Sequence, residues 1–116
     1  MPKLRQIHDG TTISELELDE SPVFIGRAAG NAVQLDDSTI SGRHAVINPV
    51  PSKYLENSID YRLEDLESTN GTTVNGNKID SCILKHGDHI RVGHHEFYFS
   101  QPESSNLEAT DIIIPE

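Results

Sequence analysis

The sequence predicts an all-β domain, a sandwich of about ten to eleven mostly antiparallel strands, and two observations lead to this prediction. Short segments of alternating apolar and polar residues recur along the chain, and glycine, asparagine, aspartate or proline bounds each of them. No segment keeps apolar residues at helical spacing over the roughly ten positions that a helix needs. About ten short strands separated by such turns are typical of a sandwich or barrel.

The strands are expected in a regular order along the chain. The first two, Lys3–His8 and Thr12–Leu18, flank Asp9-Gly10, a dipeptide that favours a hairpin turn. Further strands are expected at Pro22–Gly26, Ala32–Leu35, His44–Asn48, Asp60–Leu66, Thr72–Val74, Asn77–Ile79, His89–Val92 and Glu96–Ser100. The segment Pro49–Asn57 contains two prolines, which a central strand does not tolerate, so we expect a surface loop there.

Length and composition limit the domain count and the classes of partner. The chain has 116 residues, which suits one domain; we expect it to span residues 1–101, with a flexible acidic tail at 102–116. A net charge of -10 argues against a nucleic-acid partner. Cys82 is the only cysteine, so no internal disulfide forms. Without a secretory or membrane-spanning apolar run, the sequence predicts a cytoplasmic protein with no membrane partner.

Four short motifs follow one another along the predicted strands. They are Gly26-Arg27, Ser41-Gly-Arg-His44, Ser68-Thr-Asn-Gly71 and Asn75-Gly76. Each is common by itself, but together, in this order on an all-β chain, they resemble the signature of the forkhead-associated (FHA) domain family. The resemblance covers nearly the whole span Val23–Phe99. It implies a β-sandwich with binding loops at one end, which binds phosphothreonine peptides in Ser/Thr kinase signalling and is not an enzyme.

The chemistry of the ligand agrees with the residues that the resemblance selects. Phosphothreonine carries about 1.5 to 2 negative charges and three acceptor oxygens, so its receptor needs a charged fork and several neutral donors. By similarity to the family, Arg27 supplies the fork, Ser41 a hydroxyl, Arg43 a second positive charge, and Thr69 a hydroxyl or backbone donor. Asn70 matches the asparagine that binds the ligand's backbone beside the phosphothreonine.

Other residues are expected to support the binding loops. The resemblance implies that His44 turns inward and holds the loop of Ser41, and that Gly26, Gly71 and Asn75 shape or brace the neighbouring turns. The pair Ser41 and His44 is not interpreted as a hydrolase dyad, because no nucleophile-elbow motif surrounds the serine.

Metal and cofactor binding are not expected. The remaining histidines lack the spacing of a metal site, and His94 and His95 would face opposite sides of a strand; they are His8, His86, His89, His94 and His95. No glycine-rich nucleotide-binding loop occurs either. The alternative function that remains is a structural or protein-interaction sandwich without phosphate dependence.

The tail contains a candidate ligand for the domain itself. Thr110 precedes Asp-Ile-Ile, which puts an aliphatic residue three positions after a threonine. We hypothesise that a separate Ser/Thr kinase phosphorylates Thr110 and creates an internal ligand, which gives either self-inhibition or self-association. The alternative is a disordered tail, or one whose isoleucines pad the sandwich edge. Family members carry their termini opposite the binding loops, and the nine steps from Gln101 to Thr110 span about 30 Å at most. Exchange of tails between two copies therefore fits better than self-binding. Other expected partners are a Ser/Thr kinase or its phosphorylated substrate.

Overall fold

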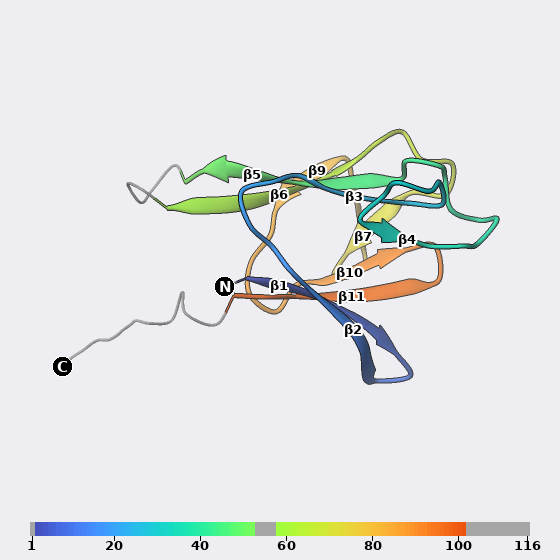
Figure 1. Ribbon diagram of the computed structural model, residues 1–116, viewed down its shortest axis with the longest axis horizontal. Helices are drawn as coiled ribbons and strands as arrows, with labels where there is room; N and C mark the ends of the chain where they lie inside the picture. Colours follow the sequence, from blue (N-terminus) through green and yellow to red (C-terminus); the bar gives the residue numbers. More distant parts are fainter. Residues whose placement is uncertain (1, 53–57, 102–116) are drawn as a thin grey trace.

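The computed structural model describes residues 2–52 and 58–101, and these form eleven strands in two stacked sheets (Figure 1). The strands are β1 (Lys3–His8), β2 (Thr11–Glu17), β3 (Val23–Gly26), β4 (Val33–Gln34), β5 (Ala45–Pro51), β6 (Ile59–Asp65), β7 (Thr72–Val74), β8 (Asn77–Ile79), β9 (Ser81–Ile83), β10 (His89–Val92) and β11 (His95–Ser100). The described residues contain no helix, and thus none that could cross a membrane. The predicted all-β sandwich is confirmed.

The two sheets have six and five strands. The strand order is β2-β1-β11-β10-β7-β8 in the first sheet and β4-β3-β5-β6-β9 in the second. The strands of the described residues pair in antiparallel fashion except for β3 with β4, which are parallel. The connection from β6 to β7 crosses from the second sheet to the first, and it carries the motif Ser68-Thr-Asn-Gly71.

Alternating residues of both sheets point inward and form one core. Its largest fully buried side chains are Phe97 and Phe99, each at most 1% exposed. Tyr61 packs its ring on Phe99, with 6.0 Å between the ring centroids, and donates its hydroxyl to the carbonyl oxygen of Asp19. This apolar layer fixes the strands from which the loops at both ends extend.

Two predictions about individual segments were wrong. The short strand β9 was not predicted, and β5 continues through Pro49 and Pro51, where a loop was expected. Along β5 the even-numbered positions exchange hydrogen bonds with β6, as the bond from Ser52 N to Ser58 O shows. The proline nitrogens therefore face the other side of β5, where pairing with β3 ends at Ile47. No neighbouring strand of the described residues needs their missing N–H groups. The rest of the expected loop, residues 53–57, lies outside the described residues.

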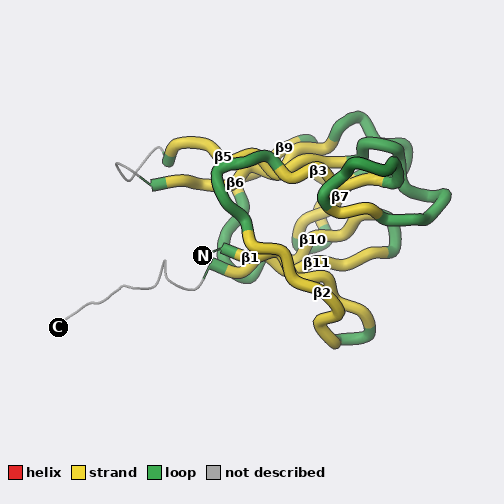
Figure 2. The backbone as a smooth tube through the Cα atoms, viewed as in Figure 1, coloured by secondary structure: helices red, strands yellow, loops and turns green. Residues whose placement is uncertain are grey.

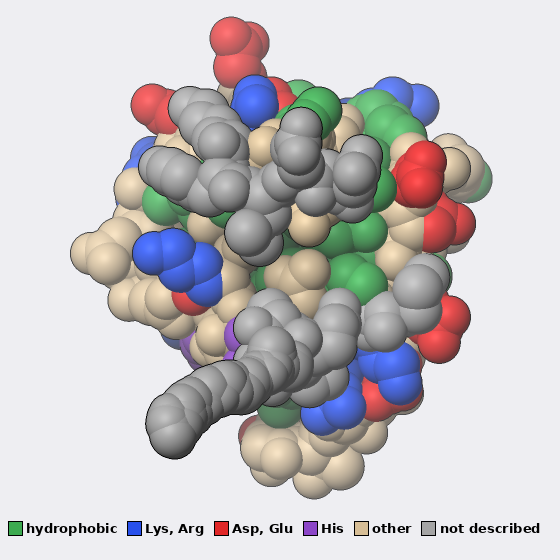
Figure 3. Space-filling view, turned by 90° about the vertical axis from the view of Figure 1, so that its left-hand side faces the viewer, with side chains coloured by type: hydrophobic (Ala, Val, Ile, Leu, Met, Phe, Trp, Pro, Cys, Tyr) green, Lys and Arg blue, Asp and Glu red, His purple; other side chains and the backbone are tan. Residues whose placement is uncertain are grey.

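The loops that carry the four motifs do not all lie together. Those after β3, β4, β6 and β10 gather at one end of the sandwich, on the right in Figures 1 and 2, whereas the start of β1 and the end of β11 lie at the other end. The expected placement of the chain ends opposite the binding loops is therefore confirmed for the described residues. Figure 3 faces that opposite end, where the visible basic and acidic side chains are interspersed. The tail 102–116, with Thr110, lies outside the described residues.

Candidate functional site

A close approach between two backbones brings the first two motifs together. Gly26 ends β3, and a Cβ atom at this position would overlap the carbonyl oxygen of Gly42. Only glycine allows the two backbone segments to come this near. The amide of Arg27 then donates to the carbonyl oxygen of Ser41 at 3.0 Å, and the amide of Ala28 to that of Gly42 at 3.2 Å. Arg27 and Ser41 therefore stand side by side.

The guanidinium of Arg27 is fixed by one of its nitrogens. Nε donates to the carbonyl oxygen of Ile40 at 3.1 Å, which sets the plane of the group beside the loop that precedes β5. The two terminal nitrogens make no hydrogen bond within residues 2–52 and 58–101. They remain available as a fork for an anion with two acceptor oxygens.

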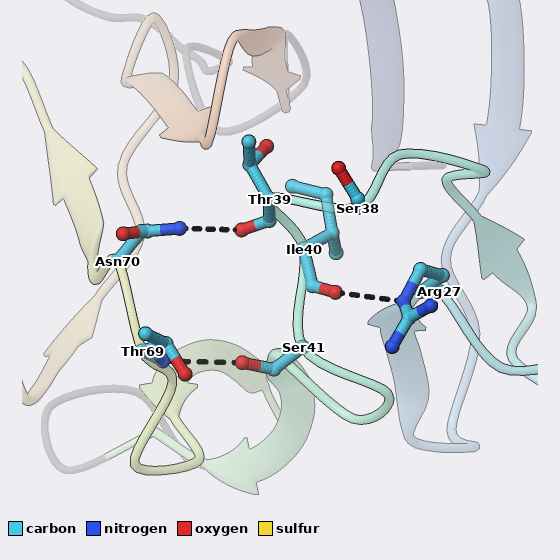
Figure 4. A pocket seen from close by; sticks show the side chains of 7 residues that line it. All are labelled: Arg27, Ser38, Thr39, Ile40, Ser41, Thr69 and Asn70. Atoms are coloured by element: carbon cyan, nitrogen blue, oxygen red, sulfur yellow. Dashed lines mark hydrogen bonds between the residues drawn. The ribbon is translucent and has the colours of Figure 1, made fainter.

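Two hydrogen bonds join the loop of Ser41 to the loop between β6 and β7. The amide of Thr69 donates to Ser41 Oγ at 3.1 Å, and Asn70 Nδ2 donates to the carbonyl oxygen of Thr39 at 2.7 Å. Each side chain keeps a group for a ligand: the Ser41 hydroxyl can still donate a hydrogen bond, and the Asn70 amide oxygen can still accept one. Figure 4 shows Thr69 and Asn70 facing Thr39, Ile40 and Ser41 across the pocket.

His44 connects the same two loops from the buried interior of the domain. Its side chain is 0% exposed, its Nδ1 accepts from the amide of Ser41 at 3.2 Å, and its Nε2 lies 2.8 Å from the carbonyl oxygen of Gly71. These partners require the tautomer with the proton on Nε2, because the Gly71 carbonyl can only accept. Both ring nitrogens are thus used internally, which leaves the imidazole without a role as a general base.

Asp65, at the end of β6, holds the loop from Ser68 to Gly71. Its carboxylate accepts from Ser68 Oγ at 2.5 Å, from the amide of Ser68 at 3.1 Å and from Thr72 Oγ1 at 2.8 Å. Ser68 Oγ in turn accepts from the amide of Gly71 at 2.9 Å. Desolvation raises the pKa of Asp65, but the hydrogen bonds from Ser68 and Thr72 outweigh it and the net shift is downward.

These residues surround a cavity of about 150 Å³ at the loop end of the sandwich (Figure 4). Its lining residues are Arg27, Ser38, Thr39, Ile40, Ser41, Thr69 and Asn70. A second hollow of about 260 Å³ shares Thr39 and Asn70 with the first and extends to Gly93 and His94 at the turn between β10 and β11. The site is thus a small polar pocket that opens beside a wider surface groove.

The structure places four of the five predicted binding residues at the cavity, namely Arg27, Ser41, Thr69 and Asn70. The fifth, Arg43, is exposed, does not line the cavity, and holds its guanidinium carbon 4.2 Å from the ring centroid of Phe24. This stacking is a cation–π contact.

The predicted supporting residues lie in different places. Gly26 and His44 join the loops, and Gly71 adopts a φ of 84°, which lets the chain turn after Asn70. Asn75, whose φ is 52°, lies at the far end of β7 and accepts from the amide of His89 at 2.9 Å. It braces the β7–β8 hairpin against β10 rather than the pocket.

Sequence reasoning missed Ser38, Thr39 and Asp37. The carboxylate of Asp37 accepts from the amide and the hydroxyl of Thr39, at 2.9 and 2.8 Å, and lies 3.2 Å from Nε2 of His95. The bonds from Thr39, with a smaller contribution from His95, lower the pKa of Asp37. An aspartate two positions before a threonine is a signal for such a side-chain turn, and it could have marked this wall of the pocket.

No group of three or more potential metal ligands occurs among residues 2–52 and 58–101. Several histidines take part in individual contacts instead, such as His89 with Glu96 at 3.2 Å. His86 accepts from the amide of Gln101 through Nδ1 at 2.9 Å.

The fold and this pocket define a class of protein, and comparisons with known proteins identify the family to which the chain belongs. The FHA domain model matches residues 23–93, and the chain belongs to the FHA domain family. This span contains every motif residue that suggested the resemblance.

Individual relatives agree with this assignment. The chain is 35% identical over 94 residues to the transcriptional regulatory protein EmbR of Mycobacterium tuberculosis, covering 80% of this chain and 22% of EmbR. It is 35% identical over 86 residues to the glycogen accumulation regulator GarA of the same species, covering 74% of this chain and 49% of GarA. It therefore spans half or less of these relatives. A structure from a study of phosphothreonine-dependent FHA domain interactions superposes with a TM-score of 0.71 at 33% identity, covering 86% of this chain and 95% of that one.

Proposed function

We propose that this chain is a cytoplasmic phosphothreonine-dependent binding module that recognises a phosphorylated protein in Ser/Thr kinase signalling and catalyses no reaction. The observation that carries the proposal is the arrangement of Arg27, Ser41, Thr69 and Asn70 around one small cavity. A related FHA structure comes from work on phosphothreonine-dependent interactions, which supports the same ligand class here.

Each group of the pocket has a defined task in this function. The free terminal nitrogens of Arg27 pair with two phosphate oxygens, and the hydroxyls of Ser41 and Thr69 donate to the phosphate. The free amide oxygen of Asn70 accepts from a backbone N–H of the peptide, so the peptide is held independently of its side chains. Because internal hydrogen bonds hold the side chains of Arg27, Ser41 and Asn70, these side chains are positioned before the ligand arrives.

Titration with a phosphothreonine peptide and its unphosphorylated twin tests the proposal. The phosphorylated peptide should bind and the twin should not. Arg27→Ala should weaken binding at least about tenfold, since hydrogen bonds to charged groups contribute about 1.5 to 3 kcal/mol. Arg62→Ala is the matched control. Arg62 lies on β6 and does not line the cavity, so the substitution removes the same charge away from the site. Binding that ignores the phosphate or survives Arg27→Ala would instead favour an interaction sandwich without phosphate dependence.

We also propose that phosphorylated Thr110 is a ligand for this pocket in a second copy of the chain. The end of β11 lies at the end of the sandwich opposite the pocket (Figure 1). The nine residue-to-residue steps from Gln101 to Thr110 reach about 30 Å only when fully extended. A tail that exchanges between two copies avoids this strain and closes as a symmetric dimer.

Sedimentation of the chain with phosphothreonine at position 110 tests this second proposal. A dimer that returns to a monomer when Arg27 is replaced by alanine supports it, and Thr110→Ala treated with the same kinase is the control. A phosphorylated chain that stays monomeric at every concentration, with unchanged resonances for Ser41 and Asn70, contradicts it.

A further inference from the structure

Ser38 belongs to the wall of the pocket, and neither the motifs nor the proposed mechanism uses it. The residue is exposed, and it lines the same cavity as Arg27 and Ser41. Within residues 2–52 and 58–101 its hydroxyl has no hydrogen-bond partner, whereas Ser41 and Ser68 both use theirs. A polar group that is left free inside a phosphate-sized pocket is a candidate ligand contact.

The backbone at Ser38 is held by its neighbours. The amide of Ile40 donates to the carbonyl oxygen of Asp37 at 3.0 Å, which closes a turn with Ser38 at its first central position. The carboxylate of Asp37 binds Thr39 on one side and His95 on the other, so the turn is anchored to β11. On the far side of the pocket Asn70 holds the carbonyl oxygen of Thr39. The backbone of Ser38 is therefore held in a fixed position at the wall of the pocket.

Only the orientation of the side chain remains to be set. Figure 4 shows Ser38 on the Arg27 side of the pocket, with its hydroxyl turned away from Ser41. An exposed serine exchanges among three staggered positions about this bond, and no internal hydrogen bond of Ser38 has to be broken for the hydroxyl to turn inward. An incoming dianion supplies an acceptor that the surrounding side chains do not offer to this hydroxyl.

We propose that Ser38 is a further ligand-binding residue whose hydroxyl donates a hydrogen bond to the phosphate of the bound phosphothreonine. This inference rests on the proposed function of the pocket. The phosphate has three terminal oxygens with more than one acceptor position each, so Ser38 adds a donor and does not displace Arg27 or Ser41. The four lining side chains that donate to the phosphate are then Arg27, Ser38, Ser41 and Thr69.

The test compares wild type with Ser38→Ala and Ser38→Thr on three ligands: a phosphothreonine peptide, its unphosphorylated twin, and phosphothreonine capped at both ends. Ser38→Ala should weaken the phosphopeptide and capped phosphothreonine by the same factor, about tenfold, because both lose a hydrogen bond to a charged group. Ser38→Thr keeps a hydroxyl and should bind within about threefold of wild type. Ser14→Ala removes a serine hydroxyl from β2, in the other sheet, and should change nothing.

The outcomes separate this inference from the function on which it rests. Wild-type affinity in Ser38→Ala overturns the role of Ser38, while the function of the pocket stands. A loss for the peptide but not for capped phosphothreonine also overturns it, because the contact would then be to the peptide. A wild-type chain that does not distinguish the phosphopeptide from its twin overturns the proposed function and this inference together. Equal midpoints of thermal unfolding for the variants show that folding does not cause the loss.

Discussion

Replacing His44 by alanine should weaken folding and ligand binding together, because one buried ring joins the two loops of the pocket. The side chain is 0% exposed, and its removal leaves the amide of Ser41 and the carbonyl oxygen of Gly71 without their partner. An unpaired buried polar group costs about 1 to 3 kcal/mol, and the cavity left by the ring adds to this. We therefore expect a loss of about 3 to 5 kcal/mol in the free energy of unfolding.

Urea unfolding and peptide titration of three variants measure this effect. His44→Ala should also lower phosphopeptide affinity at least about tenfold, since the freed loops must be ordered again on binding. His44→Asn keeps a short acceptor for the Ser41 amide, and His44→Gln keeps a longer donor for the Gly71 carbonyl. Each should recover part of the stability. If His44→Ala unfolds at the wild-type urea concentration and binds with wild-type affinity, the proposed linkage between the loops is refuted.

Three further predictions follow from contacts around the pocket. Gly26→Ala should cost about 1 to 3 kcal/mol of stability and weaken phosphopeptide binding, because its Cβ would overlap the backbone of Gly42. Gly42→Ala is the control. Its Cβ would meet only a methyl group at 3.9 Å, so it should match wild type in urea unfolding and in peptide titration. The lowered pKa of Asp65 means that its contribution to stability is complete above the unfolded value of about 3.9 and is lost as pH falls through the folded value. Asp65→Asn should accordingly be less stable than wild type at pH 7 and lose less stability on acidification below about pH 4, as urea unfolding at neutral and acidic pH would show. An equal loss of stability in wild type and variant on acidification would contradict the stabilising role of the Asp65 carboxylate. Asn70→Ala should weaken phosphopeptides of different flanking sequence by a similar factor in titrations, since the amide grips the peptide backbone; losses that vary widely with the flanks would argue for side-chain recognition instead.

Local patterns predicted most strands because short runs of apolar and polar residues end at recognisable turn residues. β1, β7, β8 and β10 have the predicted bounds. β9, Ser-Cys-Ile, is as short as β7 and β8, but no turn dipeptide such as Asn75-Gly76 marks it in the sequence, and its pairing with β6 defines it. The prolines of β5 misled the prediction for a related reason. Whether a strand tolerates proline depends on how far its neighbour extends, and the sequence near Pro49 does not contain that information.

The motifs predicted the centre of the pocket but not its walls. Arg27, Ser41 and Asn70 come from three segments far apart in the sequence, and only similarity to a known family groups them there. Arg43 lies two residues after Ser41, and spacing alone does not reveal that it turns to stack on Phe24. Residues such as Ser38 escape a motif search because their position depends on a turn that neighbouring side chains hold in place.

The construction of the pocket explains why binding and folding are linked in this domain. Ser41 and Asn70 each use one hydrogen-bonding group on the opposite loop and keep another for the ligand. The internal bond fixes the side chain before binding, so the ligand does not have to supply the cost of ordering it. The loop of Ser41 joins two strands of the five-stranded sheet, whereas the loop of Asn70 crosses from that sheet to the six-stranded one, and the buried ring of His44 joins the two loops. A change in packing between the sheets would therefore alter the spacing of the groups that face the phosphate, even where it touches none of them.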